Sequence, residues 1–249
     1  MTLGRARINE IHRALPTRRA EIHPGLRLAH GLDRWPDGDN ADIKKNLIND
    51  IAALQKPPFY AHALRRWKKI TGDPQRFFSF ELPLQNRLYI GLSRDNPVET
   101  GVTVSHSYGM PIIPGSSVKG LARASAEYVA KETGTIRSEV IHWLFGEGGD
   151  TGQGGGIFYH DAWWCGAGSP FVAEIVTPHH PDYYQGGNRP ASDTDSPIPA
   201  PQLAVTGSFY FVLEGDPQWT PVAGRLLQAG LQQWGIGGKK SSGYGYFRE

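Results

Sequence analysis

The chain has 249 residues, a formal net charge of +2 and 39% hydrophobic residues. This length fits one large domain, and the hydrophobic content supplies a core, which excludes wholesale disorder. The small charge excludes a protein that binds free nucleic acid through net charge alone, because such proteins carry a larger excess of Lys and Arg.

Cysteine content and hydropathy indicate the cellular environment. Cys165 is the one cysteine of the sequence, which excludes an intrachain disulfide and a zinc site built from several cysteines. The sequence has no apolar run of about 18 residues, and its polar, Arg-rich start lacks the apolar segment of a signal peptide. We therefore expect a cytoplasmic protein with no membrane association.

Glycine and proline are unusually frequent, with 31 Gly and 19 Pro. Together they form about a fifth of the chain, against a usual share of roughly 12%. Because the hydrophobic content argues against disorder, we expect long ordered loops, which in compact domains usually carry function.

Residues 1–75 are predicted to form an N-terminal helical extension. Apolar side chains recur at helical spacing over 39–55, and the segment 57–72 starts with two prolines that suit a first helical turn.

Residues 76–249 are predicted to form a second, α+β domain. The alternation of apolar and polar residues predicts strands, and spacing of three and four predicts helices. The expected strands cover 76–92, 157–164, 171–178 and 203–215, with a short terminal one, and the expected helices cover 116–134, 138–146 and 222–235. Two long connections, 93–114 and 179–202, interrupt them. This order favours an antiparallel sheet with helices on one face.

The stretch "IIPGSSVKG" (112–120) places a Pro-Gly turn at a predicted helix start. The first amides of a helix carry partial positive charge, and Ser116 or Ser117 can cap them. Lys119 opposes the helix dipole unless an anion lies at the turn, so the stretch suits a phosphate. An ordinary cap beside a solvated lysine is the structural alternative. Ser116 and Lys119 also match S-x-x-K, but the S-D-N and K-T-G elements of that chemistry are missing.

The stretch "GIGGKKSSGYG" (235–245) has similar ingredients. Its glycines let the backbone approach a ligand, Lys239 and Lys240 add charge, and Tyr244 offers a ring for stacking. The alternative is a flexible hairpin tip. A Walker A loop is excluded because Gln233 stands where its first glycine is required.

Candidate metal ligands do not assemble into a convincing set. His160 and Asp161 are adjacent on a predicted strand and so point to opposite faces. His179, His180 and Asp182 lie in a Pro-rich loop, where solvated histidines are ordinary. We expect neither a metal nor another cofactor.

Several stretches together resemble the RAMP superfamily of CRISPR-associated proteins. They are "ETGVTVSHSYGMPIIPGSSVKGLAR", "GGIFYHDAWW", "TPHHPDYY" with "SPIPAPQLAV", and "GIGGKKSSGYGYF". The pair "TPHHPDYY" and "SPIPAPQLAV" is most similar to the family of sixth subunits of type III-B (Cmr) effector complexes. The resemblance covers about residue 76 to the end and implies an RRM-like (ferredoxin-like) fold.

The resemblance implies a non-catalytic RNA-binding subunit of an RNA-guided antiviral ribonucleoprotein. It would hold the crRNA backbone near its 3′ end, beside target RNA, while base pairing reads the sequence. The implied protein partners are a repeated backbone RAMP subunit, a head RAMP subunit and a small helical subunit. Segment 93–114 would form a thumb against the guide–target duplex. We expect weak, salt-sensitive RNA binding by the isolated chain.

The predicted site has two parts. The predicted RNA-binding residues are Gly115, Ser116, Ser117, Lys119, Arg123, Gly235, Gly237, Gly238, Lys239, Lys240, Ser241 and Tyr244. The predicted thumb residues are Val102, Val104, His106 and Tyr108. The aromatic residues Phe158, Tyr159, Phe209 and Phe211 are expected in the core rather than on an RNA-binding sheet surface.

A metal-independent endoribonuclease of the same superfamily is the alternative function. His106 or His12 would be its candidate catalytic residue. Asp95 lies at the start of the 93–114 segment, but the residues beside it offer neither a base nor a metal partner. We therefore predict no catalytic residue.

Overall fold

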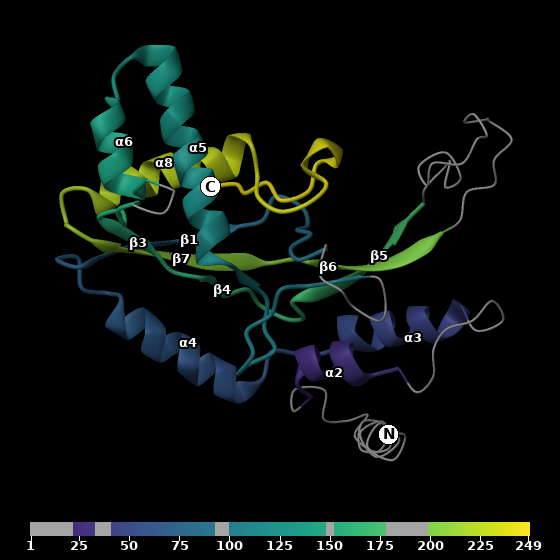
Figure 1. Ribbon diagram of the computed structural model, residues 1–249. Helices are drawn as coiled ribbons and strands as arrows, with labels where there is room; N and C mark the ends of the chain where they lie inside the picture. The colour runs from purple at the N-terminus through teal and green to yellow at the C-terminus, as the bar shows by residue number, and fades with distance from the viewer. Residues whose placement is uncertain (1–21, 33–40, 93–99, 148–151, 178–198) are drawn as a thin grey trace, which may run out of the picture.

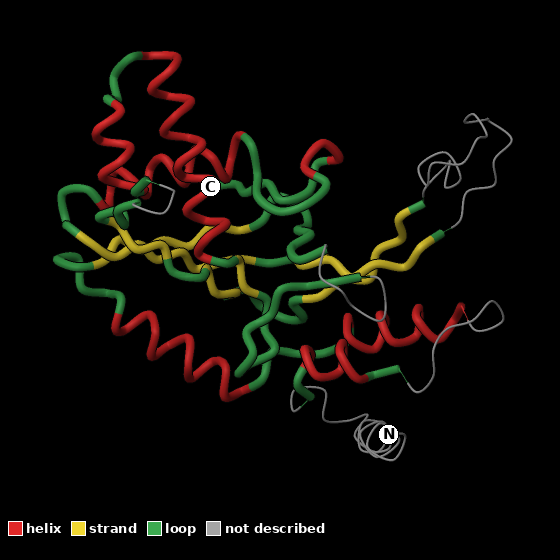
Figure 2. The backbone as a smooth tube through the Cα atoms, in the orientation of Figure 1, coloured by secondary structure: helices red, strands yellow, loops and turns green. Residues whose placement is uncertain are grey.

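A computed structural model describes residues 22–32, 41–92, 100–147, 152–177 and 199–249. Predicted features at Asp95, at His12 and in the loop with His179, His180 and Asp182 lie outside these residues. Two layers of helices enclose a central sheet (Figure 1 and Figure 2).

The central sheet is antiparallel, with β7 (Ser208–Gly215) in its middle. β7 pairs with β1 (Phe77–Pro83) on one side and with β3 (Ile157–Tyr159) and β4 (Ala162–Trp164) on the other. β2 (Ile112–Ile113) pairs with β4 at the sheet edge. A separate two-stranded sheet joins β5 (Phe171–Val176) to β6 (Ala200–Val205).

Helices α5 (Gly115–Thr133), α6 (Ser138–Phe145) and α8 (Thr220–Gln233) cover one face of the central sheet (Figure 1). The β1 alternation turns Phe78 and Phe80 toward this face, where Phe80 stacks on Phe211 with ring centroids 5.1 Å apart. Gly224 lets α8 approach Phe78, because a Cβ at Gly224 would collide with that ring. The predicted α+β fold, an antiparallel sheet with helices on one face, is confirmed.

Helix α4 (Pro58–Ile70) covers the opposite face of the sheet (Figure 1). The Thr71 hydroxyl lies 2.6 Å from the Tyr210 hydroxyl in a buried hydrogen bond. The rings of Tyr60 and Trp67 both stack on Trp163, at centroid distances of 5.9 Å. Part of the N-terminal segment thus closes the face that an RRM-like sheet leaves open, a role that its helical spacing did not predict.

The remaining N-terminal helices accompany the small sheet. α2 (Pro24–His30) and α3 (Ala41–Ala52) contact each other, and α3 packs against β5 and β6. The loop predicted over 179–202 ends earlier than expected, because Ala200, Pro201 and Gln202 pair with β5. Within the described ranges, no helix is long and apolar enough to span a membrane.

The aromatic core predictions are confirmed at two positions and wrong at one. Phe209 and Phe211 are fully buried in β7. Phe158 is 67% exposed, because β3 is short and the neighbouring residues Ile157 and Tyr159 point to the α5 side. Tyr159 is half-buried and stacks on Phe145 of α6.

Candidate functional site

The start of α5 receives its cap from a distant residue. Pro114 is the N-cap residue, and the amide of Gly115 donates a 2.7 Å hydrogen bond to Oδ1 of Asp161. The expectation that Ser116 or Ser117 caps this helix is wrong, because Asp161, in the β3–β4 turn, takes that place. An aspartate at a helix N-terminus also complements the helix dipole.

Gly115 is required by close packing at this turn. It is buried, and a Cβ there would collide with the carbonyl oxygen of Tyr159. The Pro-Gly pair therefore lets the first turn of α5 approach the end of β3.

The polar residues at the start of α5 differ in their solvent exposure and in whether they have hydrogen-bonding or ionic partners. Ser116 is exposed, whereas Ser117 and Lys119 are half-buried. Lys119 has no hydrogen-bonding or ionic partner among the described residues. Arg123 is engaged, since it pairs with Glu127 at 2.8 Å and donates to the Gly146 carbonyl at the end of α6. Lys119 is thus the cation here that is available to an anion.

The C-terminal loop follows α8 and is ordered by its own backbone. Gly235, Gly237, Gly243 and Gly245 all have φ between +65° and +89°, a region that favours glycine. Lys239 adopts the same region, with φ +56°, immediately before the 3-10 helix η1 (Lys240–Ser242). This segment is therefore a loop with a defined backbone conformation rather than a simple hairpin turn.

An aromatic pair lies beneath the lysines of the loop. The Tyr244 ring lies 4.8 Å from the ring of Tyr89, and Nζ of Lys239 lies 5.4 Å from the Tyr89 ring centroid. Tyr89 is 1% exposed, and burial, followed by the neighbouring Tyr244, raises the pKa of Tyr89 to about 12. Lys240 and Ser241 are exposed beside this pair.

A chain of backbone hydrogen bonds joins the separate parts of the predicted site. The amide of Gly238 donates to Tyr89 at 2.8 Å, the amide of Thr103 donates to Ile90 at 2.9 Å, and the amide of Ile112 donates to Thr103 at 3.1 Å. The C-terminal loop, the thumb segment and the approach to α5 are therefore side by side. With about 4.8 Å per strand spacing, three such steps span roughly 14 Å.

The described part of the thumb segment lies against the body of the protein. Val102 is buried, Val104 and Tyr108 are half-buried, and His106 is exposed. The carbonyl oxygen of His106 accepts a 3.0 Å hydrogen bond from Nε2 of His23, which precedes α2. The contact of this segment with a guide–target duplex remains a prediction.

Two functional contacts were missed by sequence reasoning. Asp161 was weighed as a metal ligand, and its capping role depends on a partner 46 residues away. Tyr89 lies within the predicted strand 76–92 and alternates with the apolar residues Leu88 and Ile90. This alternation was the sequence pattern that could have placed the Tyr89 ring on the other face of the segment.

The residues His160 and Asp161 do point to opposite faces. Nε2 of His160 lies 2.8 Å from Glu214 on the α4 side, whereas Asp161 binds the start of α5. Within the described part of the chain, no three His, Cys, Asp or Glu residues are grouped to hold a metal ion.

The RRM-like sheet, the capped α5 turn and the glycine-rich C-terminal loop together define a RAMP protein. The model of the RAMP superfamily matches residues 81–248. The chain belongs to this superfamily.

A more particular similarity is to the CRISPR system Cmr subunit Cmr6 of Pyrococcus furiosus. The two are 26% identical over 219 residues, which covers 65% of this chain, and the chain spans 64% of the length of that relative.

Two solved structures are matched by the chain, and the first of them shares its fold. The chain matches a cryo-EM structure of the type III-B Cmr-beta bound to cognate target RNA with a TM-score of 0.63 and 18% identity, over 85% of this chain and 73% of the other. It matches the crystal structure of Cmr6 from Pyrococcus furiosus with a TM-score of 0.44 and 24% identity, over 70% and 97%.

Proposed function

We propose that this RAMP protein is a Cmr6-like, non-catalytic subunit of a type III-B (Cmr) complex. In this role it holds the backbone of the crRNA near its 3′ end, beside the target RNA. Its protein neighbours are a repeated backbone RAMP subunit, a head RAMP subunit and a small helical subunit. The sequence similarity to Cmr6 and the fold shared with an RNA-bound Cmr assembly support this assignment.

The observation that carries the RNA-binding role is the hydrogen-bonded series from Gly238 to Ile112. It connects the C-terminal loop, through the segments at Tyr89 and Thr103, to the segment that leads into α5, where Lys119 lies. Nζ of Lys239 is held over the buried Tyr89 ring, and the other two lysines have no ionic partner among the described residues. Unpaired lysines beside glycine-rich backbone suit phosphate groups.

Asp161 narrows the position of that contact. Its carboxylate already accepts from the first amide of α5, so a phosphate at this amide would meet a like charge. RNA at this turn is then held by the exposed Ser116 and by Lys119, which follow Gly115 in α5.

The experiment compares crRNA retention in purified complexes. We expect the triple variant Lys119→Ala, Lys239→Ala and Lys240→Ala to assemble with less crRNA per complex than the wild type. The matched control is Lys131→Ala with Arg225→Ala, which removes exposed cations of α5 and α8. Unchanged crRNA content in the triple variant would reject the site assignment.

The non-catalytic part of the proposal has its own test. The isolated chain is incubated with repeat RNA in the absence of metal ions, and the products are resolved on a denaturing gel. Intact RNA is expected. Cleavage that disappears in the His106→Ala variant would instead identify a metal-independent endoribonuclease.

A further inference from the structure

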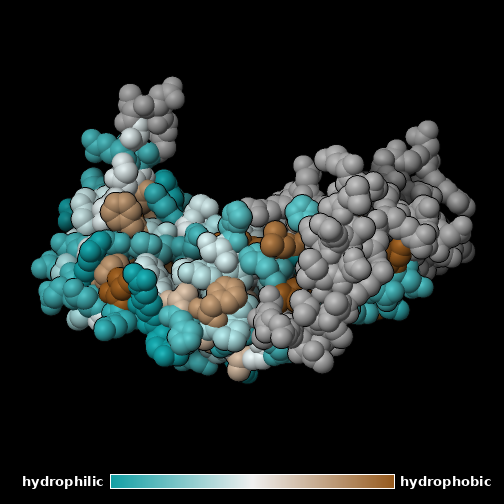
Figure 3. All heavy atoms as spheres, turned by 90° about the horizontal axis from the view of Figure 1, so that it is seen from below, coloured by the Kyte–Doolittle hydropathy of each residue, from teal (hydrophilic) through white to brown (hydrophobic). Residues whose placement is uncertain are grey.

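A hollow on the α4 side of the protein has the composition of a nucleotide-binding site. It has a volume of about 440 Å³, within the range of small-ligand sites. It lies between α4, the thumb segment and β4, and its lining includes His62, Arg66, Trp67, Ile70, Tyr108 and Trp163. We call these residues the α4 hollow. The view from below shows apolar side chains set among hydrophilic ones on this face (Figure 3).

Aromatic rings from three separate elements meet in the α4 hollow. Trp163 of β4 lies 5.9 Å from the Trp67 ring at an interplanar angle of 23°, and 5.6 Å from the Tyr108 ring. All three side chains are half-buried, so each retains some exposed surface. Nucleobases stack on such rings, and this stacking tolerates any base.

Arg66 lines the same hollow, and further cations lie on the same helix. α4 contains Arg65, Arg66, Lys68 and Lys69 and no acidic residue. Lys68 pairs with Glu81 on β1, whereas the other three cations are exposed and have no partner among the described residues. The α4 hollow therefore complements a polyanion rather than a neutral surface.

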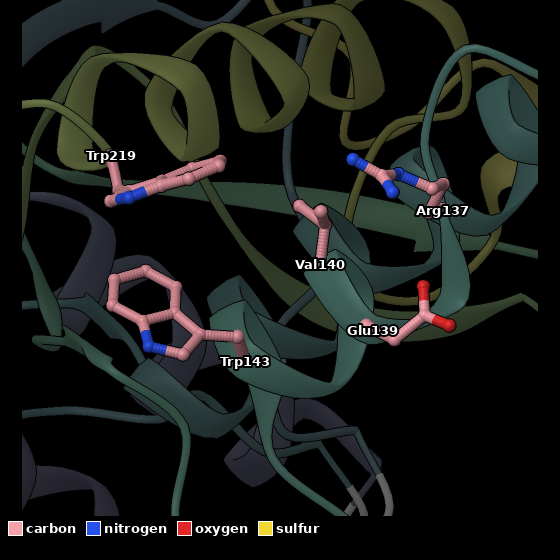
Figure 4. A pocket seen from close by; sticks show the side chains of 5 residues that line it. All are labelled: Arg137, Glu139, Val140, Trp143 and Trp219. Carbon is pink, nitrogen blue, oxygen red and sulfur yellow. The ribbon is translucent and has the colours of Figure 1, made fainter.

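A second hollow of the protein also has an aromatic lining but lacks the net positive charge of the α4 hollow. A hollow of about 390 Å³ between α6 and α8 is lined by Trp143, Trp219 and Val140, with Arg137 and Glu139 at one side (Figure 4). There the single cation is accompanied by a carboxylate.

We propose that the α4 hollow binds a nucleotide of single-stranded RNA, with its base against Tyr108, Trp163 and Trp67. Arg66, with Lys69 three residues further along the same helix face, faces the phosphate. This site lies on the other side of the sheet from the C-terminal loop. It shares Tyr108 with the predicted thumb, whereas Trp67 and Trp163 belong to the α4 hollow alone.

The first test is photo-crosslinking of the whole chain to a short single-stranded RNA that carries 4-thiouridine. We expect crosslinks at Trp163 or Trp67, which the thumb prediction does not include, located by tandem mass spectrometry. Crosslinks confined to the C-terminal loop and the start of α5 would overturn this proposal and leave the proposed function standing. Crosslinks in the α4 hollow without any at the C-terminal loop would support this proposal and contradict the RNA-binding site assigned to the C-terminal loop.

The second test measures affinity for the same RNA. Tyr108→Ala should weaken binding about tenfold, whereas Tyr108→Phe, which keeps the ring, should stay near the wild type. Arg66→Ala, at an exposed position, should weaken binding and reduce the salt slope by about 0.7. Arg137→Ala is the matched control and should change neither value.

The third measurement separates RNA from a protein occupant. If Arg66→Ala and Tyr108→Ala leave RNA affinity unchanged but release a protein subunit from the assembled complex, the α4 hollow is a protein interface and the proposal is wrong. Circular dichroism of each variant confirms that it is folded before its affinity is compared.

Discussion

The amide nitrogen of Gly115 lies 2.7 Å from Oδ1 of Asp161, so the N-terminus of α5 obtains its negative partner from the β3–β4 turn. The positive end of the helix dipole is thereby matched within the chain. Lys119 in the next part of the turn is free of protein partners among the described residues. The helix dipole is therefore matched by Asp161, whereas the Lys119 charge is left without a partner among the described residues.

Replacing Asp161 should expose the importance of this cap. Asp161→Ala is expected to lower the free energy of unfolding by about 1 kcal/mol, because the Gly115 amide loses its acceptor. Asp161→Asn keeps an oxygen acceptor and loses the charge, so its loss should be smaller. Urea unfolding at neutral pH measures both, and equal losses would show that the hydrogen bond itself contributes nothing.

Gly115→Ala should be destabilising for a steric reason. Its Cβ would collide with the Tyr159 carbonyl, and overpacking of this kind costs about 1–3 kcal/mol. Gly120→Ala in the same helix is the control, since its Cβ would meet no atom within 4 Å. That control should raise stability by about 0.5–1 kcal/mol, because alanine is the better helix former. Equal thermal unfolding temperatures for the two variants would contradict the packing described for Gly115.

The sequence predicted those features that depend on local pattern. The alternation within 76–92 predicted the strand that β1 forms, and the Pro-Gly pair marked the start of α5 within one residue. The exposed Phe158 was misjudged, because alternation along a three-residue edge strand does not reveal whether anything covers the outer face.

Long-range partners were beyond the reach of sequence pattern. The Asp161 cap, the Tyr89 contact with the C-terminal loop and the placement of α4 over the sheet each join distant segments. Spacing rules describe which side of one element a residue occupies, but not which other element will face it. The glycines of 235–245 were expected to let the backbone approach a ligand, whereas the structure shows that they let it approach the segment at Tyr89.

The attachment of α4 to the sheet can be tested at Tyr60. Its hydroxyl donates a buried 2.6 Å hydrogen bond to the Trp164 carbonyl. Tyr60→Phe should lower the free energy of unfolding by about 1–2 kcal/mol, because the buried carbonyl loses its donor. Tyr128→Phe on α5 is the control, since Tyr128 is 50% exposed. Chemical denaturation of the two variants in parallel measures this difference. Equal free energies of unfolding for Tyr60→Phe, Tyr128→Phe and the wild type would contradict this role of Tyr60.

Cys165 should be a slow thiol in the folded protein. Burial, and then the neighbouring Glu81 carboxylate, raise the pKa of Cys165 to about 12. Thiolate is the reactive form, so its fraction at pH 8 is small. Ellman's reagent should react much more slowly with the native protein than with the protein unfolded in guanidinium. Similar rates in the two states would show that the thiol is accessible and ionises normally.

Glu214 should make stability depend on acidity through its partners Arg76 and His160. Burial alone raises the pKa of Glu214, but hydrogen bonds and charge from Arg76 and His160 outweigh it, so the pKa lies below its ordinary value of 4.5. A carboxylate whose pKa is lowered by folding stabilises the folded state fully above the unfolded pKa, and this contribution disappears as pH falls through the folded pKa. Glu214→Gln should therefore be less stable than the wild type by about 1–2 kcal/mol at pH 7.

The same linkage fixes how the difference between wild type and Glu214→Gln changes with pH. It should remain constant down to about pH 5 and shrink at lower pH, where the wild-type carboxyl becomes protonated and loses its ionic contacts with Arg76. Urea unfolding curves collected from pH 7 to pH 3 measure this, with Glu132→Gln, an exposed position on α5, as the control that should follow the wild type. A difference that stays the same at acidic pH would mean that the Glu214 side chain stabilises the sheet through its shape and neutral hydrogen bonds rather than through its charge.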